Sequence, residues 1–209
     1  MPKVTLSLVR DILAPNEIRQ IATPFAAAWP EAGLLLWRGE KLDLANGTLL
    51  EGPGPLSADD DGGPLLRFTV STTSDTATGP GTVLETRSVT TGSSNVLLRL
   101  DSVTFPPGAT AWRHVHPGPG FRFLLKGALR LEGDDHVQDA VSGDCWFEDA
   151  NSPVRATAST DHPETVFIRL MVLPLEYKGR RTIRILSEED RNRERRQTTR
   201  TFFDAAVKL

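Results

Sequence analysis

From residue 65 onward, the apolar and polar positions follow the pattern of an all-β protein. Short segments rich in β-branched, aromatic and alternating apolar residues predict strands at residues 65–72, 82–90, 95–105, 111–116, 121–126, 128–132, 144–147, 154–158 and 165–173. Residues 182–186 are a candidate for one more strand. Turn-forming residues separate these segments at residues 78–81, 92–94, 106–108 and 133–135. Many short strands without helical periodicity predict a sandwich or a closed barrel.

The first part of the chain has a mixed pattern. Pro15 and the polar residues after it predict a short helix through Ile18, Ile21 and Phe25, because proline suits a first helical turn. Pro24 would end this helix early. Residues 34–44 then predict a strand, and the following Asn-Gly pair at residues 46–47 predicts a hairpin, since both residues tolerate positive φ.

Residues 51–64 separate this first part from the strands. Their sequence, EGPGPLSADDDGGP, is dominated by glycine, proline and acidic residues, which is typical of a solvated loop or linker. We therefore expect an N-terminal extension at residues 1–64, containing a helix and a hairpin, and a β-barrel at residues 65–186.

The C-terminal segment, residues 187–209, predicts a short charged helix. Ser187 can cap a helix whose first turn is acidic and whose later turns are basic, an order that complements the helix dipole. Its arginines are interpreted as a solvated face rather than as a phosphate site. The closing apolar residues, among them Phe202 and Phe203, are expected to dock on the barrel or on a second subunit.

Composition excludes several classes of protein. The formal net charge of −3 argues against a nucleic-acid partner, which would require a basic face. The single cysteine, Cys145, cannot form an internal disulfide and suits a reducing compartment. No apolar run approaches the roughly 18–20 residues of a membrane span. We therefore expect a cytoplasmic protein with neither a nucleic-acid nor a membrane partner.

The candidate chemistry is concentrated at residues 108–127, GATAWRHVHPGPGFRFLLKG. His114 and His116 are one residue apart, so in an extended strand both imidazoles point to the same face. They could grip one ion or one small molecule. A Pro-Gly-Pro-Gly turn follows, and a second strand continues to Gly127.

These residues resemble the cupin family. Gly108, five further residues, His114-x-His116 and Gly127 are similar to the first cupin motif, and Gly143-Asp144 with the later Pro153 resembles the beginning of the second. The resemblance covers residues 65–173. It implies a jelly-roll barrel, the double-stranded β-helix of the cupins, here in a single domain.

The resemblance also implies a divalent metal, often iron, manganese, nickel or zinc, held by two histidines, a glutamate and a later histidine. His114 and His116 match this pattern. The glutamate position falls on Gly120 and the later histidine position falls near Val154, so the metal motif is degenerate. Glu148, Asp149, Asn151 and His162 are the candidates for completing a metal site. Without them, the histidine pair would line a barrel that has no cofactor.

Strand parity predicts the residues that contact a ligand. If the histidines face the interior, so does Trp112, and across the turn Arg122 faces inward. The alternative is that Arg122 faces solvent and Phe121 and Phe123 line the pocket. Three further residues are expected to contribute to substrate binding: Trp146, Phe147 and Arg99.

Two functional hypotheses follow. The first is a metal-assisted cupin enzyme, a dioxygenase, isomerase, lyase or cyclase acting on a small carboxylate- or carbonyl-bearing compound. The second is a metal-free cupin that binds or senses a small ligand without catalysis. No catalytic residue is assigned in either case. We expect a homodimer, because related barrels commonly pair through edge strands.

Overall fold

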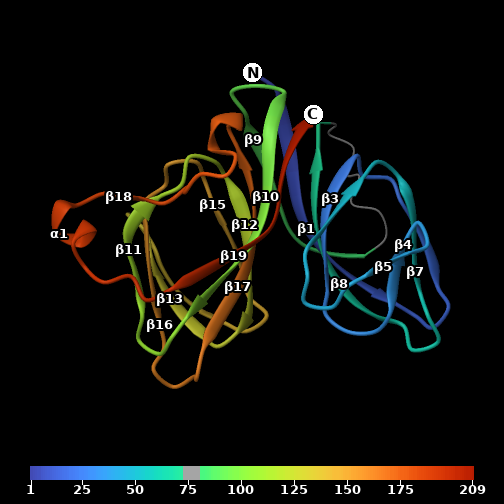
Figure 1. The fold of residues 1–209 in the computed structure, drawn as a ribbon, viewed down its shortest axis with the longest axis horizontal. Helices are drawn as coiled ribbons and strands as arrows, with labels where there is room; N and C mark the ends of the chain where they lie inside the picture. Colours follow the sequence, from blue (N-terminus) through green and yellow to red (C-terminus); the bar gives the residue numbers. More distant parts are fainter. Residues whose placement is uncertain (73–80) are drawn as a thin grey trace. The chain divides into compact units, whose positions relative to one another are not determined.

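The computed structural model describes residues 1–72 and 81–209, which form two compact units (Figure 1). One unit comprises residues 1–94 together with residues 208–209, and the other comprises residues 95–207. The predicted boundary between residues 64 and 65 lies inside strand β8, Gly63–Ser71, which pairs along its whole length with β1. The first part of the chain is thus a folded unit of its own rather than an extension with a linker.

The N-terminal unit contains two β-sheets. Its strands are β1 Lys3–Leu13, β2 Ile18–Ile21, β3 Phe25–Pro30, β4 Leu35–Trp37, β5 Glu40–Leu42, β6 Thr48–Glu51, β7 Gly54–Ala58, β8 Gly63–Ser71 and β9 Thr82–Thr90. One sheet has the order β6-β3-β8-β1-β9 and the other the order β2-β7-β4-β5. Apolar side chains from both sheets, such as Leu65 and Leu56, share one buried core.

The predicted N-terminal helix is wrong. Its residues form strands β2 and β3, because β2 pairs with β7 and β3 pairs with β6 and β8. Tertiary pairing overrides the weak helical pattern, and Ile18, placed on the helix's apolar side, is exposed.

The predicted hairpin at Asn46 and Gly47 is also misplaced. Strands β4 and β5 are joined by Arg38 and Gly39, both of which have positive φ, as a two-residue hairpin turn requires. The predicted linker contains strand β7, whose Leu56 is completely buried between β2 and β4. Only a short turn of that segment matches the predicted loop.

The C-terminal unit is a β-barrel of two five-stranded sheets. Its strands are β10 Asn95–Phe105, β11 Thr110–Val115, β12 Gly120–Lys126, β13 Ala128–Glu132, β14 Val137–Val141, β15 Cys145–Glu148, β16 Val154–Ala158, β17 Thr165–Leu173, β18 Arg184–Ile185 and β19 Thr198–Lys208. The sheets have the orders β15-β12-β17-β10-β19 and β14-β13-β16-β11-β18. Apolar residues of both sheets pack in one core, which includes Val103, Leu124 and Phe167. The predicted all-β fold is confirmed.

Two short helices interrupt the C-terminal unit, η1 at Leu175–Tyr177 and α1 at Glu188–Arg191. The Ser187 hydroxyl accepts a hydrogen bond from the backbone N–H of Asp190, so the cap forms where the sequence predicts it. The predicted C-terminal helix is nevertheless a single turn. Residues 198–208 form β19, which runs beside β10 (Figure 1), because their threonines and phenylalanines favour an edge strand.

Strand β14 was not predicted from the sequence, and the valines at both of its ends are exposed. Of the turn predicted at residues 78–81, residues 78–80 lie outside the described residues. In the described part of the chain, no helix has the length and apolar character that crossing a membrane would require.

Candidate functional site

The C-terminal unit contains a cavity of about 620 Å³ that is open to solvent on one side. Its apolar wall is formed by eight residues from six strands: Val103, Phe105, Ala111, Leu131, Trp146, Val154, Ala156 and Phe167. Its polar wall combines the two histidines with three carboxylates and five arginines: His114, His116, Asp101, Glu148, Asp204, Arg99, Arg169, Arg180, Arg181 and Arg195. The cavity therefore has an apolar side and a side with an excess of positive charge.

The two histidines lie side by side at this wall. His114 lies in the buried end of β11, and His116 directly follows the last residue of that strand; both histidines are at most 5 % exposed. Their rings meet edge to face with centroids 5.0 Å apart. Strand alternation thus places both imidazoles at the cavity, as the sequence predicts.

His114 presents an unprotonated nitrogen to the cavity. Its Nδ1 lies 2.7 Å from the carbonyl oxygen of Trp112, and a carbonyl can only accept, so Nδ1 carries the proton. Burial lowers the pKa of His114 below its ordinary value, because desolvation disfavours the charged ring. Nε2 of His114 therefore keeps its lone pair.

His116 uses both of its ring nitrogens in contacts with the protein. Nη1 of Arg169 donates to Nε2 across 3.0 Å, and Nδ1 lies 3.2 Å from the hydroxyl of Thr182. Burial and then the neighbouring Arg169 guanidinium hold the pKa of His116 well below its usual range. The lone pair of His116 is thus taken by a cationic side chain.

Arg169 is itself held by a buried carboxylate. Its Nε and Nη2 donate to the two oxygens of Asp101 at 2.6 and 3.2 Å, a bidentate pair from directly opposed positions on β17 and β10. Neither Asp101 nor Arg169 was predicted from the sequence. A signal was present for Arg169, which interrupts an apolar run in β17, but only the strand register shows that Asp101 of β10 faces it.

Arg122 faces inward, the first of the two predicted alternatives. It is 1 % exposed and lies opposite Arg169 across the pair β12–β17, and its Nη2 is 2.7 Å from Oε2 of Glu148. Desolvation lowers the pKa of Arg122 to about 10, which leaves it charged near neutral pH. Arg122 pairs with Glu148, which lines the cavity, but Arg122 is not itself among the residues that line it.

Trp146 lines the cavity as predicted, and its indole N–H donates to Oε1 of Glu148 at 3.0 Å. Phe147 does not line the cavity, because alternation turns it to the opposite face, where its ring packs on Phe121 with centroids 5.1 Å apart.

Arg99 lines the cavity but is engaged by the protein. Its guanidinium forms an ion pair with Asp204 at 2.8 Å and donates to the carbonyls of Tyr177 and Arg180. Its placement was predicted, whereas its partners were not.

Trp112 was placed wrongly. The register of β11 on β16 shifts between Ala111 and His114, and this bulge puts Ala111 rather than Trp112 on the cavity side. The indole instead donates to the carbonyl of Glu194 at 3.1 Å, and the guanidinium of Arg193 lies over its ring at 4.4 Å.

The additional candidate metal ligands do not converge on the histidines. His162 is exposed in a bend between β16 and β17. Asn151 is exposed and has a φ of 60°. Its backbone N–H, not its side chain, donates a hydrogen bond to the backbone carbonyl oxygen of His116. Asp149 is also exposed. Glu148 alone of the four reaches the cavity, where it pairs with Arg122.

The donor set does not fit the metal that the cupin resemblance implies. No group of three His, Cys, Asp or Glu side chains within residues 1–72 and 81–209 is placed to hold a metal ion. A Cβ at Gly120, the glutamate position, would lie 1.9 Å from the carbonyl oxygen of Leu170, so the backbone there leaves no room for a side chain. Val154, at the position of the later histidine, adds an apolar surface to the cavity. A transition-metal site normally needs at least three protein ligands.

Comparison with known proteins decides the family of this barrel. Residues 101–172 match the model described as Cupin domain. The barrel is a cupin domain. None of the curated proteins matches the chain in sequence.

Several solved structures are similar to this chain in fold. Salicylate 1,2-dioxygenase from Pseudoaminobacter salicylatoxidans, solved as adducts with gentisate, matches with a TM-score of 0.53 at 12 % identity, covering 80 % of this chain and 68 % of that one. A Cupin 2 conserved barrel domain protein from Leptotrichia buccalis gives 0.52 at 15 %, covering 82 % and 85 %. AerE from Microcystis aeruginosa gives 0.56 at 13 %, covering 83 % and 88 %. At these identities the likeness establishes the fold.

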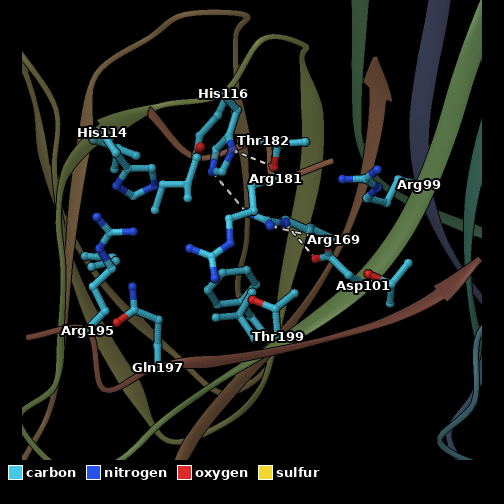
Figure 2. A pocket seen from close by; sticks show the side chains of 18 of the residues that line it. Arg99, Asp101, His114, His116, Arg169, Arg181, Thr182, Arg195, Gln197 and Thr199 are labelled. Carbon is cyan, nitrogen blue, oxygen red and sulfur yellow. Dashed lines mark hydrogen bonds and ion pairs between the residues drawn. The ribbon is translucent and has the colours of Figure 1, made fainter. Parts of the chain in front are cut away.

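Three arginines complete the polar wall of the cupin domain. Arg180 and Arg181 come from the segment before β18, and Arg195 comes from the segment between α1 and β19. Within the described residues, none of their guanidinium groups has an ion-pair or hydrogen-bond partner. Figure 2 shows Arg181 and Arg195 extending into the space in front of the two histidine rings. The arrangement can therefore receive an anion next to neutral imidazoles and an apolar wall.

Proposed function

We propose that the cupin domain binds a small organic anion, a carboxylate with an apolar body, without the participation of a metal ion. The observation that carries this proposal is the set of unpaired guanidinium groups at the cavity, those of Arg180, Arg181 and Arg195. Arginine donates through a planar fork that matches the two oxygens of a carboxylate.

The charge balance supports an anionic ligand. Five arginines line the cavity against three carboxylates, namely Asp101, Glu148 and Asp204. Each of these carboxylates is already engaged by an arginine of the protein. The remaining positive charge therefore lacks an internal counterion, and a bound carboxylate would supply one.

The apolar wall supports a ligand with a carbon skeleton rather than an inorganic anion. Trp146 and Phe167 meet edge to face with centroids 5.3 Å apart, and small residues such as Ala111 and Ala156 leave open space beside them. A cavity of about 620 Å³ is in the range of small-molecule sites. We propose that the apolar body packs here and the carboxylate meets the arginines.

The metal-assisted reaction that the sequence also predicted is not part of this proposal. Its donor set lacks a third ligand, and the lone pair of His116 is hydrogen-bonded to Arg169. The proposal assigns binding and no reaction.

The test is a titration of the protein, freed of metal by chelation, with benzoate and phenylacetate. Benzamide serves as the neutral isostere, and gentisate, the compound named with the salicylate 1,2-dioxygenase structure, is a further probe. We expect the carboxylates to bind and benzamide to bind much more weakly. Replacement of Arg181 or Arg195 by glutamine should weaken carboxylate binding about tenfold each, the equivalent of about 1.4 kcal/mol.

Arg184→Gln is the matched control. Arg184 is an exposed arginine on β18, close in sequence to Arg181, and does not line the cavity. Its replacement should leave carboxylate affinity unchanged. Binding of benzamide as tightly as benzoate, or equal losses in all three variants, would contradict a specific anion site.

A further inference from the structure

The position of the Arg169 guanidinium distinguishes this cupin domain from a metal-binding one. In the site where two histidine nitrogens would meet a metal, Nε2 of His116 instead accepts a hydrogen bond from Nη1 of Arg169 at 3.0 Å. The guanidinium is a permanent charge, because arginine does not lose its proton in proteins. A divalent ion approaching His116 would meet both an occupied lone pair and a positive side chain.

The fold fixes this guanidinium in place. Arg169 and Asp101 are directly opposed across β17 and β10, at the centre of the long pairing between these strands, and both are at most 8 % exposed. The bidentate contact leaves the arginine plane little freedom. Thr182 contacts the other ring nitrogen of His116. The side chains of Asp101, Arg169, His116 and Thr182 therefore form one connected polar network (Figure 2).

The same guanidinium retains donors for a ligand. Arginine carries five N–H groups, and the contacts with Asp101 and His116 use three of them. One N–H on each terminal nitrogen is left, and Arg169 lines the cavity. Neutral Nε2 of His114, in the same wall, is the nearby acceptor without an N–H of its own.

We propose that Arg169 is the resident cation of this site: it excludes a divalent metal from the histidine pair, and its two remaining N–H groups bind a carboxylate oxygen of the ligand. This inference deepens the proposed function and rests on it. Arg181 and Arg195 are exposed and contact the outer part of the anion, whereas the buried Arg169 holds it at the wall of the barrel.

The test removes the ion pair as a unit. Replacing Arg169 alone would leave Asp101 as a buried, unpaired carboxylate, which destabilises a fold strongly. The double variant Asp101→Asn with Arg169→Gln keeps polar side chains of similar size in both places and leaves neither an unpaired carboxylate nor an unpaired guanidinium at these two positions. Its folding is checked by circular dichroism and thermal melting before any titration.

Two titrations are made on the chelator-treated double variant and on the wild-type protein. With benzoate, we expect the double variant to bind at least about tenfold more weakly, because a charge-assisted contact is lost. With zinc, we expect the double variant to bind at least about tenfold more tightly than the wild type, because His116 regains an accessible lone pair beside His114. Adding His114→Gln to the double variant should abolish the gain in zinc affinity.

Arg169→Lys is the second variant, for the case that the double variant does not fold. Lysine keeps the charge opposite Asp101 but lacks the planar fork, so benzoate binding should still weaken. Unchanged benzoate affinity in either folded variant would overturn the assignment of Arg169 as a ligand contact. Tight, equimolar zinc binding by the wild type would overturn its role in excluding metal. Failure of the proposed function is recognised separately, as absence of carboxylate binding in the wild type.

Discussion

At the scale of single residues, the site is governed by imidazoles that are kept neutral. Burial comes first among the causes that lower the pKa of His116, followed by the positive charge of Arg169, and the neighbouring His114 and the charge of Arg122 lower it further. In the unfolded chain the ring would titrate near its ordinary value of 6.5. His116 therefore binds a proton more weakly in the folded state than in the unfolded state, and this difference links the free energy of unfolding to pH.

This linkage has a definite sign. Above pH 6.5 His116 is neutral in both the folded and the unfolded state, so its pKa difference does not change the free energy of unfolding. As the pH falls below 6.5, the unfolded state binds the proton first, so stability is lost progressively towards the lower pKa of the folded state. His116→Gln should lose less stability between pH 7.5 and about 5.5 than the wild type. Urea denaturation at both pH values measures the difference.

His162→Gln is the control for this prediction, since His162 is exposed. Its pH dependence should match that of the wild type. If His116→Gln also retained the full pH dependence, the buried imidazole would not be its source.

The sequence predicted which side chains face the barrel interior better than it predicted their partners. The inward placement of His114 and His116 was predicted, and that of Arg122 was one of two alternatives, because alternation along a strand needs only local sequence. Arg99 was a candidate because it breaks an apolar run. The partners of these side chains were not predicted, because the pairing of Arg99 with Asp204 depends on strands far apart in the chain.

At the scale of elements, one β-bulge decides which side chains reach the cavity. The shift between Ala111 and His114 turns Trp112 away from the ligand and towards the segment between α1 and β19. Periodicity cannot reveal a bulge, since the alternation simply restarts one residue later. The strands of the barrel were nevertheless predicted well, because β-branched and aromatic runs between turn residues are local signals.

Trp112 therefore has a positioning role that the sequence did not suggest. Its indole holds Glu194 by a hydrogen bond and Arg193 by a cation–π contact, and Arg195 lies next in the chain. Trp112→Ala should weaken benzoate binding about two- to fivefold, because Arg195 is then held less firmly at the cavity. It should also speed tryptic cleavage after Arg193.

Trp112→Phe is the matched variant, since it keeps an aromatic face for Arg193 while removing the indole N–H. It should fall between the wild type and Trp112→Ala in both measurements. A Trp112→Ala protein with wild-type affinity and wild-type cleavage would show that Trp112 does not position this segment.

At the scale of the whole molecule, the chain contains two β-units instead of one barrel with appendages. The N-terminal unit was not recognised because several of its strands, β2 and β4 to β7, are short and its turns are rich in glycine, proline and aspartate, as in residues 51–64. Such a composition resembles a linker, and the pairing of β7 with β2 and β4 becomes evident only in three dimensions. The core of that unit depends on contacts between residues distant in sequence.

A homodimer remains a prediction at this scale. Strand β9 ends the order of its sheet in the N-terminal unit, and its Val83 and Leu84 are exposed apolar side chains. An exposed edge strand presents unpaired backbone N–H and C=O groups with which a second chain can pair. Sedimentation equilibrium at micromolar concentration should give twice the mass of the chain, and a monomer under these conditions would contradict the prediction.

The central claim is that the cupin domain binds an organic anion without a metal. Calorimetric titration of chelator-treated protein with benzoate, repeated after addition of zinc, iron, manganese or nickel, tests it most directly. The account predicts one benzoate per chain with the same affinity in every case, and much weaker binding of benzamide. Benzoate binding that appears only after a metal is added would contradict it.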